Sequence, residues 1–251
     1  MTSKQTIQLY LKISFGLMIP TAIIFILLNS IGIATSGNFL GILGLVIGGG
    51  STAIAGIITA KRSGRVTSYA TILKEFFRLK QPILAYLLVL LFLLLNFGLK
   101  LQPFSPGNFV SLFLVSILFG GIEEIGWRYM FQPTLEKDRS FFVATIVTFL
   151  AWGGWHLLYF VVDGSLFSMT PLSLLSFLIG LLGNSFILGS LFSITKSLWL
   201  CVFYHACLNA FTQVLGANSL VYSILAASIS VVFACGLVYY SEMKVNKSLP
   251  E

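Results

Sequence analysis

Charged residues are scarce in this chain of 251 residues: Asp, Glu, Lys and Arg make up 9% of it, whereas 57% is hydrophobic. The mean hydropathy is +0.96. Because no polar stretch is long enough to form a soluble domain, this composition excludes a soluble enzyme and predicts a polytopic membrane protein. We expect one membrane domain over residues 1–251, an all-α bundle of about eight transmembrane helices.

Cysteine is also rare, with only Cys201, Cys207 and Cys235. All three fall in apolar segments, so they are predicted to be buried thiols that imply no disulfide framework. The net charge of +7 does not indicate nucleic-acid binding, because the Lys and Arg residues of a membrane protein gather on its cytoplasmic loops. We therefore expect the lipid bilayer, and no nucleic acid, as a partner.

Eight apolar segments predict the membrane spans. They cover approximately residues 7–30, 38–60, 82–99, 108–131, 141–162, 171–195, 198–215 and 220–240. If the N-terminus is cytoplasmic, then of the 15 basic residues Lys100 alone falls outside and Arg128 alone lies within the membrane, while the rest are cytoplasmic. No small-residue cleavage site follows the first segment, so we expect it to remain as a span. The sequence thus predicts a multi-pass protein of the cell membrane with both termini cytoplasmic.

The longest polar connection, residues 61–80, contains a helical pattern. Tyr69, Ile72, Leu73, Phe76 and Phe77 recur at helical spacing with basic residues between them. This pattern predicts either an amphipathic helix on an anionic leaflet or a short helix packed on the bundle.

Three charges interrupt the fourth apolar segment, in the stretch Gly-Gly-Ile-Glu123-Glu124-Ile-Gly-Trp-Arg128. Ionisable residues inside a span are expensive, so they predict a functional site, with a buried structural ion cluster as the alternative. Glu124 and Arg128 are four residues apart and share a helix face, which predicts an ion pair. Glu123 is rotated by about 100° from Glu124 and has no charged neighbour at i+4. A carboxylate left unpaired in an apolar setting suits a general base.

Both histidines of the chain, His156 and His205, also fall in apolar segments. Trp152 shares a helix face with His156, and Asn209 shares one with His205. A lone core histidine is more often a hydrogen-bonding residue than a catalyst. Here, however, three helices carry a carboxylate, two imidazoles and an amide, so we expect one shared site within the bundle.

Several chemistries fit this set of side chains. A carboxylate and an imidazole can deprotonate a water while a second imidazole and an amide stabilise an oxyanion, as peptide hydrolysis requires. Glu123, His156 and His205 could instead hold a zinc ion with an open fourth position. A proton relay in a carrier is a third interpretation, although the chain shows no repeated halves. The motifs His-Glu-x-x-His, Gly-x-Ser-x-Gly and Cys-x-x-Cys are absent.

In order, Glu123-Glu124-x-x-x-Arg128, Trp152-x-x-x-His156 and His205-x-x-x-Asn209 resemble three motifs of the CPBP intramembrane proteases, also called the CAAX protease and bacteriocin-processing, or Abi, family. The family has Phe where this chain has Trp152, a change that we expect to alter pocket shape more than chemistry. The resemblance covers about residues 111–211, the expected catalytic core. It implies that Glu123 and His156 activate water, that His205 and Asn209 support the oxyanion, and that Glu124 and Arg128 form a structural pair.

The resemblance therefore implies an intramembrane endopeptidase acting on a membrane-associated peptide or protein. A glutamate mechanism without a cofactor is favoured, and zinc bound by Glu123, His156 and His205 is the alternative. A non-catalytic bacteriocin-immunity or binding protein and a proton-coupled carrier are the other functions that the sequence allows.

Overall fold

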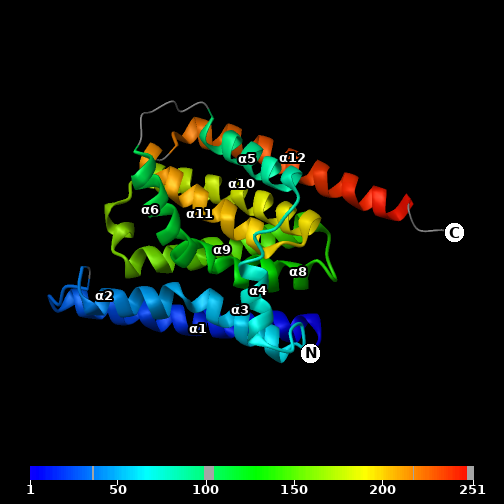
Figure 1. Cartoon of the computed structure of the whole chain (residues 1–251). Coiled ribbons are helices and arrows are strands. Elements are labelled where there is room, and N and C mark those ends of the chain that lie inside the picture. The colour runs from blue at the N-terminus through cyan, green and yellow to red at the C-terminus, as the bar shows by residue number, and fades with distance from the viewer. Residues whose placement is uncertain (36, 99–104, 217, 248–251) are drawn as a thin grey trace.

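The computed structural model describes residues 1–35, 37–98, 105–216 and 218–247, and side chains up to residue 244 (Figure 1). Every regular element in this part of the chain is a helix. Seven helices are long and apolar enough to cross a membrane, and Ile83–Phe97 is a shorter apolar helix. The predicted all-α, polytopic bundle of about eight spans is therefore confirmed.

The predicted spans match the observed helices closely at most of their ends. In chain order the helical elements are α1 (Ser3–Ser30), α2 (Phe39–Gly44), η1 (Leu45–Gly49), α3 (Ser51–Arg62), α4 (Tyr69–Phe76), α5 (Ile83–Phe97), α6 (Pro106–Ser116), η2 (Ile117–Gly121), α7 (Glu123–Gly126), η3 (Trp127–Phe131), α8 (Gln132–Leu135), α9 (Phe141–Val162), η4 (Ser165–Ser168), α10 (Pro171–Thr195), α11 (Leu198–Leu215) and α12 (Leu220–Lys247). The predicted end of the third span at Leu99 and the external Lys100 lie outside the described residues.

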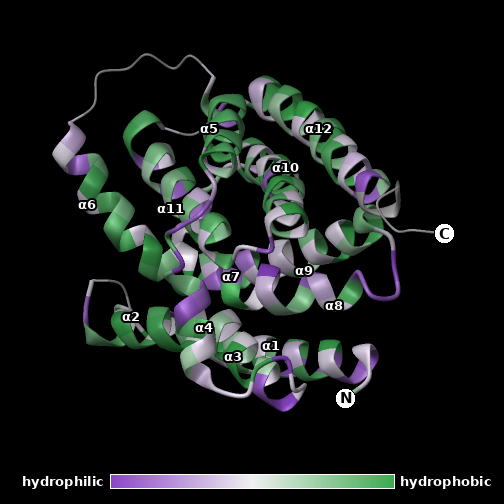
Figure 2. Cartoon of the chain, turned by 45° about the vertical axis from the view of Figure 1, so that its right-hand side comes forward, coloured by the Kyte–Doolittle hydropathy of each residue, from purple (hydrophilic) through white to green (hydrophobic). Residues whose placement is uncertain are grey.

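The helices form layers around a central pair. The hairpin of α1 with α2 and α3 lies along one side, α9 comes next, and α10 and α11 separate α9 from α5 and α12 (Figure 1). Both described ends of the chain lie at the same end of the bundle (Figure 1). The outward faces are strongly apolar, as in Leu84 and Val232, which are 74% and 73% exposed (Figure 2). Such faces suit contact with lipid.

Local sequence signals fix several helix ends. The Ser140 hydroxyl accepts a hydrogen bond from the amide of Val143 at the start of α9, and Thr170 does the same for Ser173 at the start of α10. Pro171 occupies the first turn of α10, where its missing N–H is harmless. The free thiols of Cys201 and Cys207 are buried as predicted, whereas Cys235 is only half-buried.

The predicted helix in the connection 61–80 is present as α4, which packs against α3 and α11. Ile72 and Phe76 point into the bundle, whereas Tyr69, Leu73 and Phe77 are exposed. Of the two interpretations, the structure shows the short helix packed on the bundle. Its exposed side remains apolar.

The segment Pro106–Leu135 departs from the regular span that the sequence predicts. Two π-helical turns, η2 and η3, flank the single turn α7 that carries both glutamates. Pro133 contributes to the second, because it has no N–H to bond the carbonyl of Tyr129. π-Turns are frequent at functional sites, and here they set how Glu123 and Glu124 face the rest of the bundle.

Candidate active site

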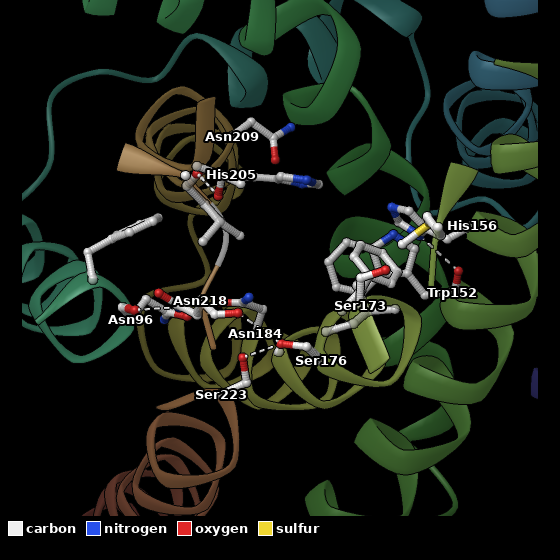
Figure 3. Close-up of a pocket in the computed structure, with 18 residues that line it drawn as sticks. Asn96, Trp152, His156, Ser173, Ser176, Asn184, His205, Asn209, Asn218 and Ser223 are labelled. Atoms are coloured by element: carbon white, nitrogen blue, oxygen red, sulfur yellow. Dashed lines mark hydrogen bonds between the residues drawn. The ribbon is translucent and has the colours of Figure 1, made fainter. Parts of the chain in front are cut away.

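A cavity of about 320 Å³ lies between α5, α9, α10, α11 and the start of α12 (Figure 3). One part of its wall carries Trp152, His156, His205 and Asn209. The structure therefore brings three of the four predicted catalytic residues, His156, His205 and Asn209, to one cavity. Glu123 does not line this cavity but is bonded to Trp152, which does.

Glu123 is held by an interaction that joins two of the sequence motifs. Its Oε2 accepts a hydrogen bond of 2.9 Å from the indole Nε1 of Trp152. The two side chains are 4% and 1% exposed, so this bond is shielded from solvent. A Phe at position 152 has no donor for the carboxylate. The expectation that Trp152 changes shape more than chemistry is therefore incomplete, because its N–H fixes the predicted base.

Glu124 contacts two partners. Its Oε2 lies 3.7 Å from Nε of Arg128 in a fully buried pair, the arrangement that the i,i+4 spacing predicts. Its Oε1 lies 2.7 Å from Nδ1 of His205, a contact that the sequence does not reveal. Arg128 also bonds Ser185 at 3.4 Å and lies 4.9 Å from the ring of Trp152. Glu124 therefore orients a predicted catalytic imidazole in addition to pairing with Arg128.

The contact with Glu124 determines which ring nitrogen of His205 is left for other partners. A carboxylate only accepts hydrogen bonds, so Nδ1 carries the proton and Nε2 is left for another partner. Nε2 lies beside Asn209 over the backbone of Gly120. A Cβ at position 120 would come within 2.4 Å of Nδ2 of Asn209 and 3.1 Å of Nε2 of His205. Only glycine at position 120 leaves room for this imidazole and amide.

His156 presents its ring to the same cavity. Its Nδ1 lies 3.0 Å from the carbonyl oxygen of Trp152, so Nδ1 donates and Nε2 keeps a lone pair that can accept a proton. The ring centroid of Trp152 is 5.3 Å from that of His156 and 5.5 Å from that of His205. Both imidazoles thus lie close to the same indole.

The alternative zinc site is not assembled. Among the residues that the structure describes, no group of three or more His, Cys, Asp or Glu side chains is placed to hold a metal ion. The indole of Trp152 lies close to both imidazoles and donates to the carboxylate of Glu123. We therefore derive no step that passes through a metal.

A comparison with protein-family models gives a match in this core. Residues 105–211 match the model described as "Rce1-like: Type II CAAX prenyl endopeptidase Rce1-like". Residues 105–211 are thus similar to an Rce1-like domain, and this match confirms the resemblance of the segment to CAAX proteases. A search of curated proteins found no match to the chain.

The matched segment, residues 105–211, contains every side chain of the predicted site, from Glu123 to Asn209. The cavity itself extends beyond that segment. Asn96 and Phe97 from α5, Asn218 just before α12, and Ser223 in α12 complete its wall. The flanking helices therefore shape the space in which a substrate would lie.

Proposed function

We propose that this chain is an intramembrane endopeptidase that hydrolyses a membrane-associated peptide or protein with a water molecule activated by Glu123. The observation that carries the proposal is the convergence of three motifs on Trp152. Its indole bonds the carboxylate, and its ring lies close to both imidazoles. His156, His205 and Asn209 line one cavity, and Glu123 is joined to its wall through Trp152, which supports a shared site for a base, a proton acceptor and an oxyanion donor pair.

In the proposed reaction Glu123 takes a proton from the water, and the hydroxide adds to the carbonyl carbon of the scissile peptide bond. The unprotonated Nε2 of His156 offers a second position for the water to bond. The C–N bond then breaks as the proton passes from Glu123 to the leaving amine. Atoms and charges balance without a co-reactant.

His205 and Asn209 stabilise the oxyanion in this scheme. The buried carboxylate of Glu124 accepts from Nδ1–H of His205, and a His205 that also carries a proton on Nε2 presents that N–H to the developing charge. The amide Nδ2 of Asn209 supplies a second donor. Phe177, Leu181 and Leu208 surround the cavity with apolar surface, which strengthens these interactions.

The test is cleavage of membrane peptides by the purified protein in detergent, followed by mass spectrometry with and without a strong chelator. The peptides include one that ends in a prenylated CAAX sequence, since the matching family model is that of CAAX prenyl endopeptidases. We expect cleavage that survives the chelator and disappears in Glu123→Gln. Cleavage that the chelator abolishes and zinc restores would refute the glutamate mechanism.

The same variant separates the non-catalytic functions. A binding or immunity protein needs the fold but no proton transfer, so a Glu123→Gln protein with full biological function would overturn the protease proposal. A proton-coupled carrier would cleave nothing and would show pH-driven uptake in liposomes.

A further inference from the structure

A cluster of three asparagines lines the cavity at a distance from the histidines. It consists of Asn96 on α5, Asn184 on α10 and Asn218 just before α12, which lie side by side in Figure 3. The hydrolytic steps above use none of these amides. In a membrane interior such groups are expensive unless each finds a partner.

A chain of hydrogen bonds fixes how these amides point. Nδ2 of Asn96 donates to the carbonyl of Phe92 at 3.2 Å and to the hydroxyl of Tyr204 at 2.8 Å. The Tyr204 hydroxyl in turn donates to Oδ1 of Asn184 at 2.6 Å. Because the backbone carbonyl can only accept, the direction of every bond along this chain is determined. Asn184 therefore ends the chain with its NH₂ group free to donate.

Asn218, in contrast, leaves a hydrogen-bond acceptor without a partner. Its Nδ2 donates to the carbonyl of Asn96 at 2.8 Å, so its amide cannot be turned over. Its Oδ1 is buried and has no hydrogen-bond partner among the described residues. Nδ2 of Asn184 likewise has none in the part of the chain that the structure describes. The two residues line the cavity with one unused donor, on Asn184, and one unused acceptor, the covered Oδ1 of Asn218, which a substrate reaches when the Asn218 side chain shifts.

We propose that Asn184 and Asn218 form a subsite that binds a peptide group of the substrate backbone. The NH₂ of Asn184 donates to the substrate carbonyl, and Oδ1 of Asn218 accepts the substrate N–H. This inference rests on the proposed function for the identity of the substrate as a peptide. It assigns the two asparagines to substrate binding and leaves proton transfer to Glu123 and the histidines.

The charge of the wall argues against an anionic ligand at this subsite. No Lys or Arg is present among the described residues that line the cavity, and the unpaired Oδ1 of Asn218 would repel a carboxylate or a phosphate. A peptide group matches one donor and one acceptor. A peptide freed from helical hydrogen bonding needs such partners in an apolar cavity, and contacts to its main chain favour binding of many sequences.

Peptide binding to the Glu123→Gln protein tests the subsite without requiring turnover. The probe is an acetylated, amidated pentapeptide of apolar residues that carries fluorescein at one end. Its saturable binding in detergent is measured by fluorescence anisotropy. In this background Asn184→Ala and Asn218→Ala should each raise Kd about fivefold, the effect of losing one net hydrogen bond. Asn108→Ala, at an exposed position near the start of α6, is the matched control and should leave Kd unchanged.

A second peptide, methylated at every peptide nitrogen, keeps the proposal testable if a variant unfolds. It should bind the Glu123→Gln protein about fivefold more weakly than the parent peptide, because it cannot donate to Asn218. In the Asn218→Ala variant, methylation should change Kd little. An equal methylation penalty in both proteins would overturn the assignment of Asn218.

The outcomes separate this inference from the proposed function. Cleavage by the wild-type protein, together with Kd values that stay unchanged when either asparagine is replaced, would refute the subsite alone. Kd values that depend on both asparagines without any cleavage would refute the endopeptidase proposal alone. Neither cleavage nor saturable binding would overturn both.

Discussion

Replacing Trp152 with Phe removes one hydrogen bond from Glu123 and restores the residue that the CAAX protease motif carries. The bond measures 2.9 Å and joins a buried indole to a buried carboxylate. Hydrogen bonds to charged groups contribute about 1.5–3 kcal/mol. If that energy positions the base in the transition state, kcat should fall about tenfold to a hundredfold, because about 1.4 kcal/mol corresponds to a factor of ten.

Trp155→Phe is the matched control. Its indole Nε1 donates a bond of equal length, 2.9 Å, to Ser51 and not to a catalytic group, and its side chain is equally buried. We expect this control to lower thermal stability by about 0.5–1.5 kcal/mol while kcat stays near the wild-type value. A Trp152→Phe enzyme with unchanged kcat, or two variants that lose kcat equally, would refute the role assigned to the indole.

Three other changes test the surroundings of the site. Gly120→Ala should reduce turnover strongly, because the added Cβ would come within 2.4 Å of the Asn209 amide and displace it. Steady-state kinetics at unchanged expression would show this loss. Normal turnover would contradict the placement of Asn209. Glu124→Gln and Arg128→Met should each destabilise the fold by about 3–5 kcal/mol, measured by thermal unfolding in detergent, because each leaves a buried partner unpaired. Burial raises the pKa of Glu136 above its usual 4.5, so the folded state holds this proton more tightly than the unfolded state does. The stability of the wild-type protein should therefore fall as the pH rises from 4.5 through the raised pKa. Glu136→Gln should lose that part of the pH dependence, and identical pH–stability curves would argue against it.

The sequence predicted the features that depend on local spacing. The bounds of α9, α10 and α11 follow from the lengths of their apolar runs, and the structure shows Ser140, Thr170 and Ser197 capping their N-termini. The Glu124–Arg128 pair follows from the helical period alone. The orientation of the bundle, with cytoplasmic termini, stays a prediction from the distribution of basic residues.

The features that the sequence did not predict depend on contacts between helices. Trp152 meets Glu123 across 29 positions of the chain, and His205 meets Glu124 across 81. No periodicity in one helix reveals which residue of another helix it faces. The π-turns around α7 and the grouping of Asn96, Asn184 and Asn218 have the same origin in tertiary packing. The available signal for Trp152 was its position one turn before His156, which showed a shared face but not the bond to Glu123.

The central claim is that Glu123 and His156 act together on one water molecule. The most direct measurement is kcat for peptide cleavage by Glu123→Gln, His156→Ala and the double variant, each shown to be folded by thermal unfolding. Groups that act as a unit lose most of their effect when either is removed, so the double variant should be little slower than the slower single variant. Losses that multiply in the double variant, or cleavage at the wild-type rate by Glu123→Gln, would contradict the account.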